Sequence, residues 1–442
     1  MPKLTTAATV TAPMATVATV TAATVTAPTV TAATVTAPTA TVATVTRAMV
    51  TAPTVTAATV TAPTVTRATV TAPTVTRATV TATTATAATM RASTSKAQCN
   101  TTFTGQTTYS TGSSPMSVTA VDVNGDGKLD ILVANSGSNK ASVLLNKGNG
   151  TFSVQTTYST STTPGCVASA DVNGDGKPDI IVTNAASNNT GVLLNTGNGT
   201  FATQRTYSTG YWPGTVVAAD VNGDSKPDII VTNSYSNNVG VLLNTGNGTF
   251  ATQKTYSSGT SPGSVAVADV NGDGKLDIIV TNSGSNNVGV LLNTGNGTFA
   301  TQRTYSTSSW PGSVVTADVN GDGKPDIILV NYNSNNAGIL LNIGNGTFAA
   351  QKTYSTGTAP TSVAAADVNG DGKPDIIVAS STLNNVGVLL NTGNGTFFAQ
   401  TTYSADTVPY CVIVADVNGD GKPDIIVVNN GSDNISVLLN YC

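Results

Sequence analysis

Short apolar runs alternate with polar turns along residues 166–208, in an order that predicts four β-strands. CVASAD (166–171) and TGVLLN (190–195) have the composition of half-buried strands, and DIIVTN (179–184) is a β-branched run typical of a buried strand. TFATQRTYS (200–208) predicts a fourth strand, and the ASNN and TGNG segments between the strands are turn sequences. This pattern predicts one antiparallel four-stranded sheet.

The fourth predicted strand carries two aromatic residues, Phe201 and Tyr207, which recur in this order along the chain. They are six positions apart, an even number, so a regular strand would project both from one face. We expect this pair to pack between neighbouring sheets rather than to bind a ligand.

The sheet pattern belongs to a repeat. The nine residues DVNGDGKPD begin at Asp171, and equivalent segments begin every 49 residues, at Asp122, Asp171, Asp220, Asp269, Asp318, Asp367 and Asp416. Seven repeats of this length account for almost all of residues 99–442. Repeated four-stranded sheets are typical of a β-propeller, in which roughly 4–8 blades surround a channel. The predicted fold is therefore an all-β, seven-bladed propeller.

Residues 1–98 have a different composition. They consist almost only of Thr, Ala, Val and Pro with scattered Arg and Lys, and they contain no acidic residue, aromatic residue or Gly. Such a sequence offers little with which to build a core, so we expect a disordered, low-complexity Thr-rich tail or stalk. An O-glycosylated stalk and an unmodified tail explain this composition equally well.

Acidic residues are concentrated in the repeated loops. The chain has 23 acidic residues, all of them Asp, and three in each of seven loops leave only Asp406 and Asp433 elsewhere. With 13 Lys and Arg, residues 99–442 carry a formal charge of −10. Seven divalent cations would add 14 charges and change this to +4, which removes most of the repulsion among the carboxylates.

Within each loop, oxygen atoms recur at alternate positions. Asp171, Asn173 and Asp175 supply side-chain oxygens, Lys177 supplies a backbone carbonyl while its side chain points away, and Asp179 supplies a carboxylate. This is the ligand set of a hard cation such as Ca²⁺, and no His or nearby Cys favours Zn²⁺. An EF-hand would need a Glu at position 12 and flanking helices, whereas Val182 and strands stand here.

The third loop departs from the others because Ser225 replaces Gly at position 6. A β-carbon disfavours the left-handed backbone conformation, so this loop is expected to bind a cation more weakly if the position has a positive φ.

The combination of DVNGDGKPDIIV with a later GNGTF resembles the FG-GAP, or VCBS-type, repeat found in integrin α-chain heads and in a fungal β-propeller lectin. The resemblance covers residues 99–442 and implies a seven-bladed propeller with Ca²⁺ held between the first two strands of each blade. The side chains or carbonyls that it implies as ligands are Asp122, Asn124, Asp126, Lys128, Asp130, Asp171, Asn173, Asp175, Lys177, Asp179, Asp220, Asn222, Asp224, Lys226, Asp228, Asp269, Asn271, Asp273, Lys275, Asp277, Asp318, Asn320, Asp322, Lys324, Asp326, Asp367, Asn369, Asp371, Lys373, Asp375, Asp416, Asn418, Asp420, Lys422 and Asp424.

The two ends of the repeat region complement each other. The seventh repeat stops at VLLNYC without a fourth strand, and residues 99–109, CNTTFTGQTTY, match that strand. Aligned this way, Cys99 and Cys442 occupy the same position, so we expect a disulfide bond between them that closes the ring. Cys166 and Cys411 lie in blades that are not neighbours, and we expect two buried thiols.

Aromatic residues outside the repeat pattern gather on one face of the predicted ring. The acidic loops and GNGTF turns share one face, and the SNN turns and inter-blade linkers share the other. On this second face lie Tyr211, Trp212, Tyr235, Trp310, Tyr332 and Tyr410. They are candidate ligand-binding residues for a carbohydrate or a protein, although the two Trp-Pro pairs could simply cap the ends of blades.

Several function classes are disfavoured. The chain has neither His nor Glu, so catalysis by the commonest acid–base residues is not expected. No basic stripe favours nucleic acid, and no apolar run approaches the ~20 residues of a membrane span. Six Asn-Gly-Thr segments are formal N-glycosylation acceptors, but they are equally turn sequences.

The sequence predicts a monomeric, extracellular or cell-surface, Ca²⁺-stabilised propeller for recognition or adhesion. The alternative is a structural scaffold without a ligand of its own.

Overall fold

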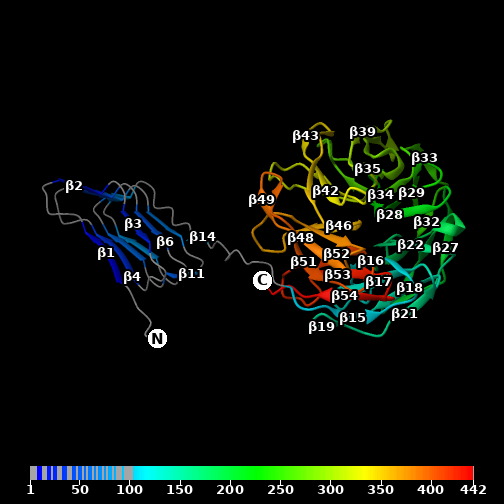
Figure 1. Ribbon diagram of the computed structural model, residues 1–442, viewed down its shortest axis with the longest axis horizontal. Helices are drawn as coiled ribbons and strands as arrows, with labels where there is room; N and C mark the ends of the chain where they lie inside the picture. Colours follow the sequence, from blue (N-terminus) through cyan, green and yellow to red (C-terminus); the bar gives the residue numbers. More distant parts are fainter. Residues whose placement is uncertain are drawn as a thin grey trace. The chain divides into compact units, whose positions relative to one another are not determined.

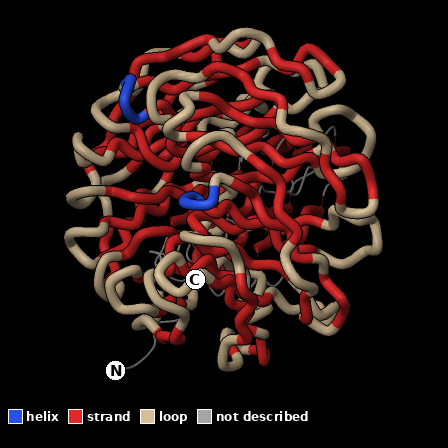
Figure 2. Tube along the Cα trace, turned by 90° about the vertical axis from the view of Figure 1, so that its right-hand side faces the viewer, coloured by secondary structure: helices blue, strands red, loops and turns tan. Residues whose placement is uncertain are grey.

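The computed structural model describes residues 103–441, together with the backbone of strands within residues 7–93. The chain separates into two units, Met1–Cys99 and Asn100–Cys442, one residue from the predicted boundary. In the second unit, four-stranded sheets are arranged around a centre (Figure 1), and strands and tight turns account for almost all of the chain (Figure 2). This is the predicted seven-bladed propeller.

Each of the first six blades consists of four antiparallel strands, which are given below in order from the centre of the ring outward. A short two-stranded hairpin lies in the chain between the third strand and the fourth. The strands of blades 1 to 3 are β16 (Pro115–Val121), β17 (Asp130–Asn135), β18 (Lys140–Leu144) and β21 (Thr156–Ser159); β22 (Pro164–Ala170), β23 (Asp179–Asn184), β24 (Asn189–Leu193) and β27 (Arg205–Ser208); and β28 (Pro213–Ala219), β29 (Asp228–Asn233), β30 (Asn238–Leu242) and β33 (Lys254–Ser257). Those of blades 4 to 6 are β34 (Pro262–Ala268), β35 (Asp277–Asn282), β36 (Asn287–Leu291) and β39 (Arg303–Ser306); β40 (Pro311–Ala317), β41 (Asp326–Asn331), β42 (Asn336–Leu340) and β45 (Lys352–Ser355); and β46 (Pro360–Ala366), β47 (Asp375–Ser380), β48 (Asn385–Leu389) and β51 (Thr401–Ser404).

Blade 7 joins the two ends of the ring. It contains β52 (Pro409–Ala415), β53 (Asp424–Asn429) and β54 (Asn434–Leu438), and its outer strand is β15 (Thr107–Ser110) from the beginning of the unit. Thr107 pairs with Val437 in an antiparallel ladder, and a bridge between Phe103 and Asn440 extends the contact. The predicted closure is thus confirmed, and β15 lies beside β54 in Figure 1.

The second strand of every blade is buried on both faces because it is covered by the two neighbouring blades. Ile180 packs between blades 1 and 2, whereas the next residue, Ile181, packs between blades 2 and 3. Each of the seven blade interfaces therefore has its own apolar cluster. This explains the continuous DIIV runs, since a strand with one solvated face would alternate.

The fourth strand differs from its prediction. In blade 2 it is split into β26 (Thr200–Phe201), which pairs with β25 (Asn195–Gly197), and β27, which pairs with β24. The other five short hairpins are β19 (Asn146–Gly148) with β20 (Thr151–Phe152), β31 (Asn244–Gly246) with β32 (Thr249–Phe250), β37 (Asn293–Gly295) with β38 (Thr298–Phe299), β43 (Asn342–Gly344) with β44 (Thr347–Phe348), and β49 (Asn391–Gly393) with β50 (Thr396–Phe397).

The expectation that Phe201 and Tyr207 project from one face is wrong because this break interrupts the alternation of side chains. Phe201 packs toward blade 1 and Tyr207 toward blade 3. Across each interface the Tyr of one blade meets the Phe of the next, as in the edge-to-face pair of Tyr207 and Phe250, with ring centroids 5.2 Å apart. The predicted role in packing between blades is confirmed.

Residues 7–93 contain short parallel strands where the sequence predicts a disordered tail. Most partners lie 25 residues apart, as in Ala7 with Ala32, or 20 apart, as in Ala58 with Ala78, whereas Val70 pairs with Ala92, 22 residues away. Both distances are multiples of the five-residue TVTAP spacing, so like residues pair, and TVT segments are rich in strand-forming residues. The strands are β1 (Ala7–Thr11), β2 (Val17–Val20), β3 (Ala23–Thr26), β4 (Ala32–Thr36), β5 (Val42–Val45), β6 (Ala48–Thr51), β7 (Thr54–Val55), β8 (Ala58–Thr61), β9 (Thr64–Val65), β10 (Ala68–Thr71), β11 (Thr74–Val75), β12 (Ala78–Thr81), β13 (Thr84–Ala85) and β14 (Ala92–Ser93).

Candidate functional site: the acidic loops and the linker face

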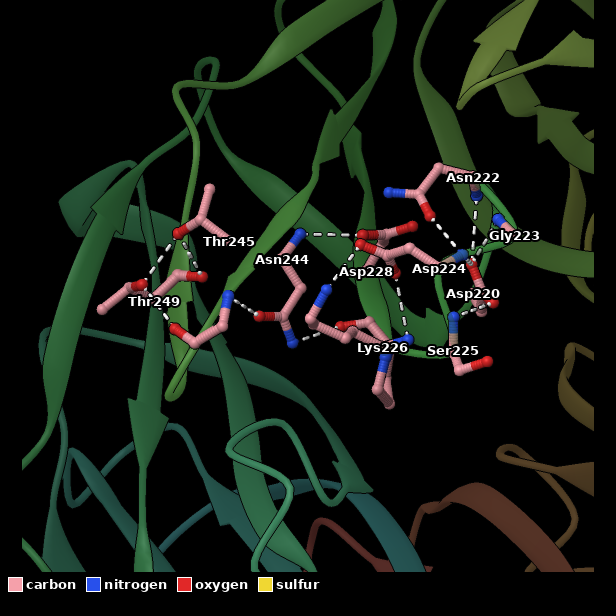
Figure 3. A network of polar contacts seen from close by, with 12 residues as sticks. Asp220, Asn222, Gly223, Asp224, Ser225, Lys226, Asp228, Asn244, Thr245 and Thr249 are labelled. Atoms are coloured by element: carbon pink, nitrogen blue, oxygen red, sulfur yellow. Dashed lines mark hydrogen bonds and ion pairs between the residues drawn. The ribbon is translucent and has the colours of Figure 1, made fainter.

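Each acidic loop is folded around the carboxylate of its first Asp. In blade 3, Asp220 Oδ1 accepts the backbone N–H groups of Gly223 (2.7 Å) and Asp224 (3.2 Å), and Oδ2 accepts that of Ser225 (2.7 Å) (Figure 3). Asn222 Oδ1 also accepts from Asp224 N, at 2.9 Å. The side-chain oxygens at positions 1 and 3 therefore turn inward, where they satisfy loop amides in Asx-type turns.

The Lys of each loop differs from its prediction. Instead of pointing away, Lys226 turns its ammonium back onto Asp224, at 2.9 Å, and the other six loops repeat this ion pair. The reason is the local excess of negative charge. Both side chains of this pair are substantially solvent-exposed, so the ion pair contributes little to stability.

The last Asp of each loop has a different environment. Asp228 is completely buried, and its two oxygens accept the N–H groups of Val221 (3.0 Å) and Asn244 (2.7 Å). Burial raises the pKa of Asp228, and the nearby carboxylates of Asp224 and Asp220 raise it further. A buried carboxylate without a cationic partner is costly, which makes this position the natural recipient of a positive ion.

An Asn after the third strand links each loop to the next blade. Asn244 donates its side-chain amide to Pro227 O in its own blade (3.0 Å) and to Val172 O in the loop of blade 2 (2.9 Å), and it accepts from Gly246 N (2.8 Å). The equivalent residues that bond the preceding blade are Asn146, Asn195, Asn244, Asn293, Asn342, Asn391 and Asn440. Sequence reasoning missed this role, although the fixed VLLN segment is its signal.

The loops fit a hard cation by the chemistry of their donors. Every side-chain donor is an oxygen, and each loop has three carboxylates but one Lys. In residues 103–441, no three acidic, His or Cys side chains already form a metal-ligand group. This follows from the hydrogen bonds above, since the carboxylates at positions 1, 5 and 9 accept separate amides. To bind a cation, these oxygens would have to give up hydrogen bonds from backbone N–H groups and coordinate the ion instead.

Ser225 has the positive φ that the sequence analysis anticipated, at 64°, where the six Gly equivalents lie near 80°. Its N–H keeps the bond to Asp220, so the loop is preserved and the cost is backbone strain. We expect Ser225→Gly to stabilise the protein by about 1 kcal/mol and to raise the cation affinity of this loop. Urea denaturation measures the first effect. The matched reverse change, Gly274→Ser in blade 4, should cost a similar amount, and a destabilising Ser225→Gly would contradict the explanation.

Protonation of the buried carboxylates gives a pH prediction for the metal-free protein. Burial raises the pKa of Asp179 and Asp424 to about 6 and that of Asp375 to about 7, from 3.8. The folded state then holds protons that the unfolded chain has released. This stabilisation is complete below pH 3.8 and is lost as the pH rises through 6 to 7. In EDTA, we expect a lower melting temperature at about pH 8 than at about pH 5, and Asp375→Asn should reduce the difference. A higher melting temperature at pH 8 would contradict this prediction.

The opposite face is formed by the turns between second and third strands and by the inter-blade linkers; we call it the linker face. Trp212 and Trp310 stand immediately before a Pro in these linkers and have positive φ of 57° and 60°. The N–H of Trp212 is held by Asn188 Oδ1 of the preceding blade, at 2.9 Å, and Trp310 is held likewise by Asn286, at 2.8 Å. Each linker is therefore fixed by the blade before it.

The six predicted aromatic residues all reach the surface of the linker face, with exposed fractions of 68% for Tyr211, 40% for Trp212, 70% for Tyr235, 47% for Trp310, 39% for Tyr332 and 38% for Tyr410. They form two groups. Trp212 and Tyr235 stack with centroids 5.3 Å apart, beside Tyr211. In blade 5, Tyr332 N donates to Trp310 O at 2.9 Å, which makes these two residues the second group, and Tyr410 belongs to blade 7.

The linker face is almost uncharged. Its turns and linkers consist almost entirely of Ser, Thr, Asn, Gly and apolar residues, and the charged residues on this face are Asp406, Asp433 and the exposed Lys140, which follows the turn of blade 1. Asp433 accepts Ser114 N (2.7 Å), and Asp406 accepts Thr407 N (2.8 Å) and the side-chain amide of Asn434 (2.9 Å). Both carboxylates therefore serve local structure, and the acidic loops lie on the other face.

Cys166 and Cys411 are free thiols, as expected, but both are partly exposed and not fully buried as predicted. The predicted partners Cys99 and Cys442 lie outside the described residues. Within the described residues, Thr104 N donates to Leu439 O, at 2.9 Å.

Comparison with known proteins identifies the repeat. A family model described as FG-GAP-like repeat matches seven overlapping segments, at residues 89–133, 122–182, 171–231, 220–280, 269–329, 318–378 and 367–427. No curated protein matches the chain in sequence.

Several solved structures share the fold at low sequence identity. Virginiamycin B lyase from Staphylococcus aureus is 16% identical, with a TM-score of 0.55, 76% of this chain covered and 99% of the lyase. BBS1N in complex with ARL6DN is 13% identical, with a TM-score of 0.56 and coverage of 77% and 96%. A lectin from Agrocybe aegerita that recognises terminal N-acetylglucosamine is 23% identical, with a TM-score of 0.49 and coverage of 65% and 80%. At these identities the similarity to the first two shows the propeller fold and nothing about activity.

Proposed function

The chain belongs to the FG-GAP-like repeat family, and from this premise we propose that it is a calcium-stabilised recognition module. Its acidic loops bind Ca²⁺ and hold the blades together, and its linker face binds the ligand. The observation that carries the second part is the group of six exposed aromatic residues on a face almost without charge.

The proposed ligand is a neutral carbohydrate. Aromatic rings stack on the apolar faces of sugar rings, and the surrounding Ser, Thr and Asn side chains can donate to and accept from sugar hydroxyls. A strongly charged ligand would find little counter-charge here, because Asp406 and Asp433 are engaged in the fold and the exposed Lys140 lies in blade 1, outside the aromatic groups. A protein anchored by Trp212 and Trp310 is the second candidate, since such residues dominate many interfaces.

Glycan-array binding with single Trp212→Ala and Trp310→Ala variants tests this proposal. Ala359 occupies the same pre-proline position in blade 6 with φ of 54°, so Ala is compatible with this backbone. We expect each variant to fold normally and to lose at least tenfold in affinity. The control is Phe398→Ala, which removes an aromatic residue that is 56% exposed elsewhere in blade 6. Unchanged binding in both Trp variants would contradict the carbohydrate site, and absence of any ligand would favour a structural scaffold.

The proposed location is extracellular or at the cell surface, where calcium is abundant and disulfides persist. A Cys99–Cys442 disulfide would complete the closure made by β15 and β54. A peptide map under non-reducing conditions should show the two cysteines in one linked fragment, whereas a free Cys99 would remove this part of the proposal. We also propose that the protein is a monomer. The part of the chain that the structure describes contains no helix long and apolar enough to cross a membrane.

We propose no enzymatic activity. The lyases share the propeller fold, but one of their structures is of a variant inactivated by replacement of a histidine, and this chain contains none. The Asp residues are placed in the loops, where their hydrogen bonds build the fold.

A further inference from the structure

A pocket lies between the outer strands of blades 5 and 6. Its volume is about 410 Å³, which is within the roughly 300–1,000 Å³ of small-molecule sites. One wall is the end of β45 in blade 5, and the other belongs to β48, β50 and the segment that leads into β51; β48 and β51 are neighbours in the sheet of blade 6 (Figure 1). The apolar lining includes Tyr354, Leu389, Phe397 and Phe398, and the polar lining includes Thr356 and Gln400.

Phe398 distinguishes this pocket from the equivalent places in other blades. In blades 2 to 5 the same position holds Ala202, Ala251, Ala300 and Ala349. The Phe398 side chain is 56% exposed, so it borders the pocket without being enclosed in the core. Blade 6 therefore offers an aromatic ring to an apolar ligand where these four blades offer a methyl group.

The polar end of the pocket adjoins a position at which the other six blades have Asn. Blade 4 shows what this Asn does: Asn282 Nδ2 donates to Asn287 Oδ1 (2.7 Å) and to Gln302 Oε1 (3.3 Å). Blades 2, 3, 5 and 7 repeat the first of these bonds. One NH₂ group at this place can therefore serve both acceptors.

Blade 6 has Ser380 in place of that Asn. Ser380 is fully buried and pairs with Asn385 on the next strand, and Gln400 lies against Gly387, two residues farther along β48. Among the described residues, none donates to Asn385 Oδ1 or Gln400 Oε1, and the Ser380 hydroxyl has no partner. Ser380 Oγ lies directly beside Gly357, the residue after the pocket-lining Thr356. Two acceptors and one hydroxyl thus meet at the polar end of the pocket.

We propose that this pocket binds an uncharged small molecule that carries a primary carboxamide on an aromatic body. The NH₂ group of the ligand donates to Asn385 Oδ1 and Gln400 Oε1, as Asn282 does within blade 4, and the ligand carbonyl accepts from the Ser380 hydroxyl. The ring lies against Phe398. None of the described residues that line the pocket is charged, so an ionic ligand would lose hydration without gaining a counter-charge. The site is independent of the proposed carbohydrate site.

Benzamide is the probe, titrated by calorimetry into the full chain in excess Ca²⁺. We expect saturable binding of one benzamide per chain. N,N-dimethylbenzamide keeps the ring and the carbonyl but has no N–H group, so it should bind at least about tenfold more weakly, because both buried acceptors stay unpaired. Absence of benzamide binding, or equal binding of the two compounds, would overturn the proposal.

Ser380→Asn provides the donor from the chain itself. Since Asn is the residue of this position in the other six blades, the variant is expected to fold, which circular dichroism checks. It should melt at a higher temperature than the parent and bind benzamide at least about tenfold more weakly. Phe398→Ala should also weaken benzamide binding, whereas Trp212→Ala should leave it unchanged and so separates this site from the carbohydrate site. Undiminished benzamide binding by Ser380→Asn would contradict the proposal.

Discussion

Asn244→Ala is expected to lower the free energy of unfolding by about 3 kcal/mol, because it leaves several buried backbone groups without partners. The Asn244 side chain is 3% exposed and bonds Val172 O, Pro227 O and Gly246 N. Alanine cannot replace any of these bonds, and Val172, whose carbonyl loses its donor, is buried. Equilibrium denaturation in urea, at fixed calcium concentration, measures the loss.

The control for this change is Thr245→Ala at the next position. The Thr245 hydroxyl is exposed and bonds only within its own turn, to Thr249. Its removal should change stability by no more than about 0.5 kcal/mol. If Asn244→Ala were equally mild, the Asn residues would not be the links between blades that their contacts indicate.

The same side chain also connects neighbouring loops, because its amide donates to Pro227 O in blade 3 and to Val172 O in blade 2. A change at Asn244 is therefore expected to weaken calcium binding in the loops of both blade 2 and blade 3. Isothermal titration of the variant should show two weakened sites, and a single weakened site would exclude coupling through this residue.

Removal of β15 is the second change with a large expected effect. A chain that begins at Thr111 lacks Phe103, which is 7% exposed, and the four residues that pair with β54. Loss of a buried Phe alone costs about 3–5 kcal/mol, and the uncovered edge of β54 would favour aggregation. We expect this chain to melt far below the parent or to aggregate, as followed by thermal unfolding and light scattering.

A chain that begins at Asn100, compared with the parent under reducing conditions so that the proposed Cys99–Cys442 disulfide plays no part, provides the control, since it lacks only the first unit. Its melting temperature should match that of the parent. Equal stability of the chains that begin at Asn100 and at Thr111 would show that blade 7 does not need its outer strand from the other end.

The fold could be predicted from the sequence because each repeat contains the signals for its own strands and turns. The continuous apolar DIIV run predicts a strand that is covered on both faces by neighbouring sheets. Asn and Gly mark the turns at which the strands end. Seven copies at one spacing then leave a closed ring as the natural arrangement, and the missing strand of the last repeat identified Phe103 and Tyr109 as its replacement.

Features that depend on contacts between repeats were not predicted. From the sequence alone, Asn244 is interpreted as a turn residue. Its second hydrogen-bond acceptor, Val172 O, lies in the adjacent blade and is known only from the structure. The break after Phe201, which directs Phe201 and Tyr207 to opposite neighbours, likewise follows from pairing, because β26 pairs with β25 in a separate hairpin while β27 pairs with β24. The Lys226 side chain turns toward Asp224 because the loop carries an excess of negative charge, and the spacing of the loop residues alone does not indicate this orientation.

The central claim, that the acidic loops are calcium sites which stabilise the ring, is tested most directly by thermal unfolding in EDTA and in a series of Ca²⁺ concentrations. A ligand that binds only the folded state stabilises it by about 2.7 kcal/mol per site at a hundred times its dissociation constant. We therefore predict that the melting temperature rises steadily with Ca²⁺ and returns to its initial value when EDTA is added in excess. A melting temperature that is the same in EDTA and in millimolar Ca²⁺ would contradict the claim.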